Sequence, residues 1–294
     1  MGVMGRIAFL FAGQGSQFVG MGNDLFAGQS GGIYDIMRNG PEEDLNKTIN
    51  AQQAVFLHGL AEGRALVAKG IWPRFVAGFS LGEITALSFA GVFNNDDIVK
   101  VRAEAMQKCC EKNSGTMVAV MRMTADKVES IAKKFEGVWP VNYNSAEQTV
   151  CSCSTAVVDD FVAAVMKEGG RAIKLKVGGA FHSPHMDEAS KAVEEFLKGQ
   201  KLNAVEGLTI FSNKTGSAYR DFEKGIYQEY ISEQINSPVK WQETIENMIC
   251  GDRMIDTFIE CGPGNVLCGL VKKIAEAKGL ADKIQIFKAE DLLK

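Results

Sequence analysis

Short apolar runs that end at glycine alternate along this 294-residue chain with stretches of helical periodicity. Residues 6–12 (RIAFLFA) form an apolar run that Gly13 ends, a pattern typical of a strand buried on both faces of a parallel sheet. Apolar residues spaced three and four apart predict a helix over 54–69. A strand over 75–77, a sharp turn and a helix over 83–90 follow. This alternation of strands and helices predicts an α/β fold built on a parallel sheet.

The middle of the chain has a different order of elements. Its strand-like and helix-like runs alternate as β-α-β-β-α-β over 115–123, 125–135, 139–144, 149–154, 157–165 and 171–177. This is the split βαβ order of ferredoxin-like domains, which close a small core of their own. Beyond it, a helix over 186–197, a strand over 208–212 and a helix over 266–277 return the chain to the first domain. We therefore predict an inserted subdomain at 115–177.

The composition, 46% hydrophobic, allows a large buried core, and Lys and Arg are spread along the whole chain at a net charge of −4. That distribution disfavours a nucleic-acid partner, since nucleic-acid binding needs a concentrated basic surface. No apolar run approaches the ~20 residues of a membrane span, and Met1 to Arg6 lack a secretory signal. Seven cysteines without a CxxC pair predict reduced core thiols and no metal site. We expect a cytoplasmic protein without a membrane partner.

The sequence Gly78-Phe79-Ser80-Leu81-Gly82 lies between a predicted strand and a predicted helix. Glycines on both sides of a serine permit a tight turn that projects its hydroxyl at the end of the strand. The following helix aims its N-terminal N–H groups at the same point, and the N–H of Leu81 is the first candidate oxyanion donor. Many Gly-x-Ser-x-Gly matches are plain turns, so the motif alone leaves Ser80 open as a nucleophile or a turn residue.

A serine nucleophile needs a base, and the chain has only three histidines, His58, His182 and His185. His58 lies within the predicted helix over 54–69, and we interpret it as a structural or surface residue. His182 and His185 share the loop after the last strand of the insert, so position alone allows either of them to be the base. A solvated, inert loop histidine is the alternative for both.

Two further segments carry polar residues that could belong to a site. The loop from Gly13 to Gln17 follows the first strand at the sheet edge expected for Ser80, where open α/β sheets bind ligands. A dinucleotide-binding loop is the alternative, which Phe18 at the third-glycine position disfavours. Arg102 lies in a helical segment, and its local pattern favours an ordinary surface arginine.

Six segments occur in a characteristic order between Ile7 and Ile274: AGQGSQ, AGFSLGE, VRAEAM, GAFHSPHM, SPVKW and ECGPGNVL. In this order they resemble bacterial malonyl-CoA:acyl-carrier-protein transacylases and the acyltransferase domains of fatty-acid and polyketide synthases. The resemblance implies a hydrolase-like parallel-sheet domain, residues 1–114 and 178–294, with an inserted ferredoxin-like α+β subdomain, residues 115–177. It also implies that the chain is an enzyme, an acyl-carrier-protein S-malonyltransferase.

Carried over at matching positions, the resemblance implies Ser80 as the nucleophile and His182 as its base. It places the two oxyanion donors at the backbone N–H groups of Gln14 and Leu81. The histidine would be oriented by the backbone carbonyl of Gln234 instead of by a carboxylate. The site would therefore hold a Ser-His dyad and no third catalytic side chain.

The resemblance also implies how the substrate is recognised. Arg102 matches the arginine that binds the free malonyl carboxylate, which a guanidinium can hold in a bidentate pair. Phe181 matches a bulky position that leaves no room for a 2-methyl branch, and Gln52 matches a pocket-lining glutamine. The chain departs from the family in two places. Phe79 replaces the histidine that usually precedes the nucleophile, and the segment 27–39 is shorter than in the family.

The implied reaction is a ping-pong transfer of malonyl from malonyl-CoA to the phosphopantetheine thiol of acyl carrier protein through a malonyl-serine. It would supply fatty-acid synthesis, although a polyketide pathway would use the same step. The reaction needs no metal or redox cofactor, and we expect a monomer whose partner is acyl carrier protein. Two alternatives stay open. A hydrolase would pass the acyl group to water, and a catalytically silent scaffold subunit would only bind the carrier, with Phe79 as its one hint.

Overall fold

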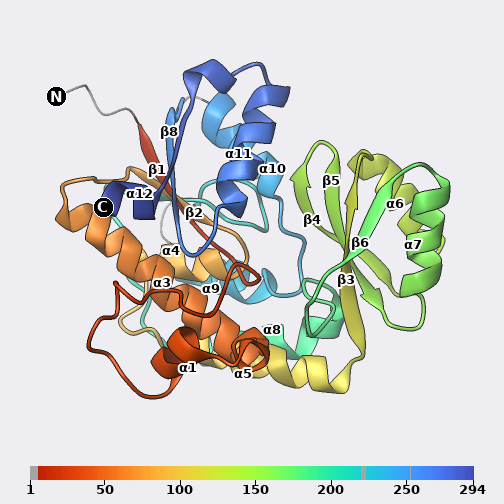
Figure 1. The fold of residues 1–294 in the computed structure, drawn as a ribbon, viewed down its shortest axis with the longest axis horizontal. Helices are drawn as coiled ribbons and strands as arrows, with labels where there is room; N and C mark the ends of the chain where they lie inside the picture. Colours follow the sequence, from red (N-terminus) through yellow and green to blue (C-terminus); the bar gives the residue numbers. More distant parts are fainter. Residues whose placement is uncertain (1–5, 220–222, 252) are drawn as a thin grey trace.

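The structure is a computed structural model that describes residues 6–219, 223–251 and 253–294 (Figure 1). Residues 1–5, most of the segment in which no secretory signal is found, lie outside the described residues. Five strands form a parallel sheet in the order β7-β2-β1-β8-β9. They are β1 (Ile7–Phe11), β2 (Phe75–Gly78), β7 (Thr209–Ile210), β8 (Thr257–Cys261) and β9 (Gln285–Lys288). The predicted α/β fold with a parallel sheet is confirmed.

The central strand β1 explains why the first apolar run shows no polar alternation. Ile7, Phe9 and Phe11 belong to the core on one face of the sheet, while Ala8 and Leu10 belong to a second core on the other face. Both faces of the strand are therefore buried, as the apolar run predicts. The parallel sheet lies between two layers of helices (Figure 1).

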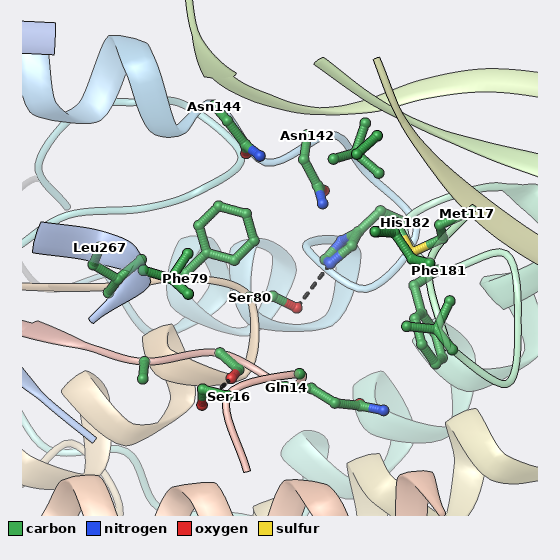
Figure 2. Close-up of a pocket in the computed structure, with 18 of the residues that line it drawn as sticks. Gln14, Ser16, Phe79, Ser80, Met117, Asn142, Asn144, Phe181, His182 and Leu267 are labelled. Carbon is green, nitrogen blue, oxygen red and sulfur yellow. Dashed lines mark hydrogen bonds between the residues drawn. The ribbon is translucent and has the colours of Figure 1, made fainter. Parts of the chain in front are cut away.

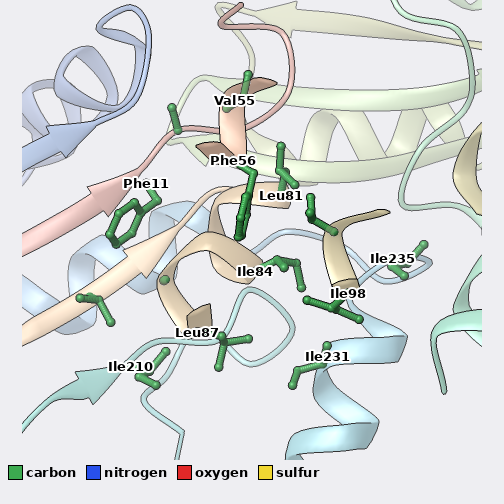
Figure 3. Close-up of a cluster of buried hydrophobic side chains, with 14 of the residues drawn as sticks. Phe11, Val55, Phe56, Leu81, Ile84, Leu87, Ile98, Ile210, Ile231 and Ile235 are labelled. Carbon is green, nitrogen blue, oxygen red and sulfur yellow. The ribbon is translucent and has the colours of Figure 1, made fainter. Parts of the chain in front are cut away.

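The helices divide between these two cores. The first core, part of which Figure 3 shows, receives side chains from α3 (Thr48–Ala68), α4 (Leu81–Phe89), α5 (Asp97–Lys112), α8 (Asp187–Lys198) and α9 (Lys224–Glu233). The second core receives side chains from α10 (Trp241–Cys250) and α11 (Val266–Ala277). The shorter helices are α1 (Ile33–Asn39), α2 (Glu42–Asn46) and α12 (Ala289–Leu293), with single 3₁₀ turns at 184–186 and 281–283. Each Val, Leu, Ile, Phe or Met side chain that these layers bury completely contributes about 1.5–3 kcal/mol.

A second, antiparallel sheet stands beside the parallel one (Figure 1). Its strand order is β4-β5-β3-β6, with β3 (Gly115–Met121), β4 (Val138–Ser145), β5 (Gln148–Ser154) and β6 (Arg171–Lys174). On one face, Val118 and Val120 of β3 pack with α6 (Ala125–Ala132) and α7 (Val158–Lys167) in a core of their own. Met117 and Ala119 alternate to the other face and join the first core. The predicted β-α-β-β-α-β order of elements is confirmed, whereas the domain boundaries at 115 and 177 stay a prediction.

Some predicted details were wrong. The helix predicted over 54–69 begins earlier, at Thr48. The prediction missed its first turns because they bury polar side chains such as Gln52, which a search for apolar periodicity does not register. The strand predicted over 171–177 ends at Lys174. All seven cysteines are free, but Cys250 is exposed, so it is not a core thiol.

Neither a metal site nor a membrane span is found in the part of the chain that the structure describes. Within residues 6–219, 223–251 and 253–294, no three His, Cys, Asp or Glu side chains come together in a way that could hold a metal ion. None of the helices in these ranges is both long enough and apolar enough to cross a membrane.

The turn between β2 and α4 brings two backbones into unusually close contact. A Cβ atom on Gly82 would lie 1.9 Å from the carbonyl oxygen of Phe11, and one on Gly78 would lie 1.9 Å from the carbonyl of Gly82. Only glycine fits at these two positions. Between them Ser80 adopts φ 54° and ψ −104°, outside the regions that non-glycine residues prefer. The Gly-x-Ser-x-Gly motif is therefore a steric requirement of this strand-turn-helix.

We expect Gly82→Ala to destabilise the fold severely, by roughly 3 kcal/mol or more, because the new methyl group must push α4 away from β1. Thermal unfolding followed by circular dichroism measures the change. Gly269→Ala is the matched control, since Gly269 lies within α11 and a Cβ atom there meets nothing within 4 Å. That variant should be as stable as the parent chain or slightly more stable, by about 0.5–1 kcal/mol. Equal effects of the two substitutions would contradict the steric argument.

Candidate active site

A cavity of about 380 Å³ lies beyond the carboxyl ends of β1, β2 and β8. Residues 12–16 after β1 and residues 79–80 after β2 line its floor, while Asn142 and Asn144 of the antiparallel sheet face it from the opposite side (Figure 2). Open α/β sheets bind ligands at this end of their strands. The sequence prediction that the Gly13 to Gln17 loop and Ser80 share one sheet edge is therefore confirmed.

Ser80 and His182 meet within the cavity. The Ser80 Oγ atom lies 2.7 Å from His182 Nε2, as the dashed line in Figure 2 marks. On the other side of the ring, Nδ1 lies 2.8 Å from the backbone oxygen of Gln234 and 3.2 Å from that of Ser237. Carbonyl oxygens only accept, so Nδ1 carries the proton and the free Nε2 lone pair faces the serine hydroxyl. This is the arrangement in which the imidazole can remove a proton from Ser80.

The other two histidines lie elsewhere. The His185 ring packs edge-on against Trp139 with a centroid distance of 5.0 Å, although it is only three residues from His182. His58 is buried in α3, with its Nδ1 atom 3.6 Å from a carboxylate oxygen of Glu62, which agrees with a structural residue. Of the two histidines that the sequence left open, the structure therefore pairs His182 with the serine.

The environment of His182 holds its imidazole neutral. Burial, reinforced by the positive charge of Arg102, lowers the pKa of His182 from the ordinary 6.5 to about 4, and the two backbone hydrogen bonds oppose this shift only in part. A histidine with a pKa of about 4 is an unprotonated base at every pH above about 5. The base therefore needs no deprotonation before it acts near neutral pH.

The predicted oxyanion donors border the same space. Leu81 is the first residue of α4, so its N–H group belongs to the turn where a helix leaves its N–H groups without intrahelical acceptors. The positive end of the helix dipole points there as well. Gln14 lines the cavity beside Ser80, on the loop after β1. The placement fits both backbone groups as donors, and their role stays a prediction.

Arg102 lies beneath Ser80, and its local reading as a surface arginine was wrong. The side chain comes from α5 and is 1% exposed. Its Nη2 donates to Ser80 Oγ at 3.1 Å and to Gln234 Oε1 at 3.0 Å, and its Nη1 donates to Gln52 Oε1 at 2.7 Å. Burial lowers the pKa of Arg102 to about 10, which leaves it charged near neutral pH. A permanent cation therefore stands within hydrogen-bonding distance of the reacting oxygen.

The wall of the cavity is largely apolar. Phe181 and Phe79 line it, together with Leu267 and other side chains of α11 (Figure 2). Phe79 packs edge-on against Trp241 at a centroid distance of 5.4 Å. The side chain of Phe79 therefore contributes packing and shapes the cavity wall. Gln52 is fully buried and binds Arg102, Gln14 and the sulfur of Met106, so it stands behind the wall rather than in it.

Four polar residues of the site had no role in the sequence prediction. Asn142 and Asn144 project from β4 into the cavity, and each has a buried Oδ1 atom without a hydrogen-bond partner. Asn213 accepts the backbone N–H of Ser80 at 2.6 Å. Glu83, two residues after Leu81, is fully buried below the serine. Only Glu83 carried a local signal, because it ends the segment AGFSLGE; the other three are brought in by distant elements.

Comparison with known proteins identifies the class that this fold and site define. The model of the family described as acyl transferase domain matches residues 29–286, a range that includes Ser80, Arg102, His182 and Gln234. The chain belongs to this family.

Several similar proteins are named malonyl CoA-acyl carrier protein transacylase. A malonyl CoA-acyl carrier protein transacylase of Bacillus subtilis (strain 168) is 35% identical over 92% of this chain and 91% of its own length. A crystal structure of the protein of that name from Clostridium perfringens is 34% identical, with a TM-score of 0.86 over 96% of this chain and 92% of the other. A malonyl-transacylase solved in complex with a type II polyketide synthase acyl-carrier protein is 27% identical, with a TM-score of 0.85 over 96% and 94%.

The lowered pKa of His182 predicts an unusual pH dependence of Ser80 reactivity. The rate at which a fluorophosphonate probe modifies Ser80 should stay nearly constant from pH 8 down to about pH 5 and fall only as the pH approaches 4. Intact-protein mass spectrometry of timed samples measures this rate. An inflection near pH 6.5 that persists in Glu83→Gln would mean that the histidine titrates like one in water, since burial raises the pKa of Glu83 itself to about 7. Ser80→Ala serves as the blank for modification elsewhere.

Proposed function

We propose that this protein is an acyl-carrier-protein S-malonyltransferase, which moves a malonyl group from malonyl-CoA to the phosphopantetheine thiol of acyl carrier protein. One observation carries the proposal: the Ser80 oxygen lies within hydrogen-bonding distance of a neutral base, His182, and of a buried cation, Arg102. A base activates the hydroxyl, and the cation suits an acyl group that bears its own carboxylate. The names of the relatives support the same substrate.

The first half-reaction acylates the enzyme. His182 Nε2 takes the Ser80 proton while Oγ attacks the thioester carbonyl carbon of malonyl-CoA, and the oxyanion is held by the N–H groups of Leu81 and Gln14. The tetrahedral intermediate collapses with cleavage of the carbon–sulfur bond. His182 returns the proton to the departing coenzyme A thiolate, which leaves a malonyl-Ser80 ester. The Gln234 carbonyl favours the imidazolium that forms in between, because it accepts the Nδ1–H bond.

The second half-reaction runs through the same atoms. The phosphopantetheine thiol gives its proton to His182 and attacks the ester carbonyl, and Ser80 recovers the proton as it leaves. This is a ping-pong sequence with one malonyl-serine intermediate. No metal or redox cofactor takes part in either step. The carrier-bound malonyl thioester would serve fatty-acid synthesis.

Recognition of malonyl follows from the charge and shape around Ser80. Arg102 would bind the free carboxylate of the acyl group, and Gln52 holds its guanidinium in place. Phe181 limits the space at the second carbon. Asn142 and Asn144 line the same cavity, and their side-chain amides would form hydrogen bonds with the amide groups of the pantetheine arm.

The proposal also includes the location, the oligomeric state and the domain classes of the protein. We infer a cytoplasmic monomer whose macromolecular partner is acyl carrier protein. We also infer that the larger domain, 1–114 and 178–294, is hydrolase-like and that the insert, 115–177, is a ferredoxin-like subdomain. The separate core between β3, β5, α6 and α7 supports the second assignment.

Ser80→Ala should abolish the covalent malonyl adduct that forms when the protein is incubated with malonyl-CoA, because it removes the hydroxyl that is hydrogen-bonded to His182. Intact-protein mass spectrometry detects the adduct, and peptide mapping assigns it. Ser16→Ala is the matched control, since Ser16 lines the same cavity but binds its hydroxyl to Gly13. A malonyl adduct that persists in Ser80→Ala would overturn the assignment.

Comparison of malonate release with malonyl-carrier formation distinguishes the transferase from a hydrolase. No adduct in the parent chain would indicate a silent scaffold.

Arg102→Ala should move the preference from malonyl towards acetyl thioesters. We expect the ratio of the two kcat/KM values to fall by roughly 10- to 100-fold, since a charge-assisted pair with the malonyl carboxylate is lost. Competition between malonyl-CoA and acetyl-CoA, read as the acyl mass on Ser80, measures this ratio. Arg102→Gln, which fills more of the buried space, guards against a folding defect, and thermal unfolding checks both variants. An unchanged ratio in a folded variant would remove Arg102 from substrate recognition.

A further inference from the structure

A buried carboxylate lies under the candidate active site without touching the cavity. Glu83 is in the first turn of α4 and is 0% exposed. Its Oε1 accepts the Tyr219 hydroxyl at 2.6 Å, and its Oε2 accepts the backbone N–H of Asn213 at 3.1 Å and Gln234 Nε2 at 3.0 Å. A buried charge persists only where it is hydrogen-bonded and paired, so these contacts require an explanation beyond packing.

Gln234 connects the Glu83 carboxylate to Ser80, His182 and Arg102. Its backbone oxygen accepts the Nδ1–H of His182. Its side-chain Nε2 donates to the backbone oxygen of Ser80 at 2.9 Å as well as to Glu83, and its Oε1 accepts from Arg102 at 3.0 Å. One residue therefore orients the base, supports the nucleophile and holds the cation.

The direction of the Gln234 amide is set by three neighbours, the Glu83 carboxylate and the Ser80 carbonyl on the nitrogen side and Arg102 on the oxygen side. An ionised carboxylate can only accept hydrogen bonds, and a guanidinium can only donate them. Glu83 therefore requires the amide nitrogen on its side, which leaves the amide oxygen to face Arg102. The reversed amide would point its oxygen at the Glu83 carboxylate and the Ser80 carbonyl and its nitrogen at the Arg102 guanidinium, and it would lose all three bonds.

We propose that Glu83 is a positioning residue that fixes the amide of Gln234 and, through it, the place of the Arg102 guanidinium beside Ser80. The inference rests on the proposed function, because it predicts an effect on the choice between malonyl and acetyl groups. Glu83 contacts neither the cavity nor the reacting atoms. It acts on the reaction only through Gln234.

The protonation state of Glu83 decides the pH at which its role can be tested. Burial raises the pKa of Glu83 to about 7, while its hydrogen bonds with Tyr219, Asn213 and Gln234 and the charge of Arg102 hold it down. At pH 8 the side chain is therefore mainly ionised. Measurements at this pH report on the carboxylate.

Glu83→Gln preserves the shape of the side chain and removes its negative charge, while the Asn213 N–H keeps an oxygen facing Gln234. At pH 8 we expect the ratio of malonyl to acetyl kcat/KM to fall by about tenfold, because the Gln234 amide loses a charge-assisted hydrogen bond and is held less firmly beside Arg102. Tyr219→Phe is the matched control, since it removes a partner of the same carboxylate from the oxygen that Gln234 does not contact. It should lower the melting temperature and leave the acyl ratio unchanged.

A double-mutant cycle tests whether the effect passes through Gln234. Gln234→Ala keeps the backbone carbonyl for His182 but removes the amide, so it should lower the ratio by itself. Adding Glu83→Gln to Gln234→Ala should cause no further fall. A merely structural Glu83 would lower stability in both backgrounds and leave the ratio untouched.

Three outcomes would overturn the inference: an unchanged ratio in folded Glu83→Gln, effects of the two substitutions that simply multiply, or an unchanged ratio in Gln234→Ala. The last result decides the matter even where Glu83→Gln does not fold. Failure of the proposed function is recognised separately. In that case the parent chain itself would form no malonyl adduct or show no preference for malonyl over acetyl.

Discussion

The site depends on how closely the start of α4 approaches the end of β1. Because Gly82 lies against the Phe11 carbonyl, the chain after β2 must reverse within a few residues, and Ser80 takes up a positive φ at the apex. The same contact aims the N-terminus of α4 at the cavity and brings the loop that carries Gln14 alongside it. Ser80, the N-terminus of α4 and the loop with the predicted oxyanion donor Gln14 are thus placed by one steric constraint.

A second constraint comes from the charges buried beneath the serine. Removing Arg102 and Glu83 from water is costly, and their hydrogen-bond partners offset that cost only when α4, α5 and the end of α9 are all in place. Those partners include Ser80 and Gln234, which also belong to the site. The same hydrogen bonds therefore stabilise the fold and orient the reacting groups. A substitution that disturbs a hydrogen bond of Arg102, or the one between Glu83 and Gln234, will change stability and reactivity together.

The predictable parts of the structure are those with a local signal. Burial on both faces makes residues 7–12 uniformly apolar, and the steric limits of a tight turn require glycine on both sides of Ser80. Arg102 had no such signal, because a buried arginine on an amphipathic helix has the same spacing as an exposed one, and only the family resemblance pointed to it. The side chain of Gln234 and the whole of Asn213 were missed for a related reason. Their partners lie more than 130 residues away, and only tertiary packing brings them together.

The side chain of Phe79 takes no part in the hydrogen bonds around Ser80. The polar atoms around Ser80 are held by Arg102, His182 and Gln234, and none of these bonds involves the side chain before the nucleophile. The Phe79 ring instead packs on Trp241 and forms part of the cavity wall. Its backbone N–H and carbonyl still bond within the turn, to Phe11 and Gly82, as any residue there would. A phenylalanine at this position therefore leaves the proton-transfer geometry intact and changes only the surface that an acyl chain or pantetheine arm would meet.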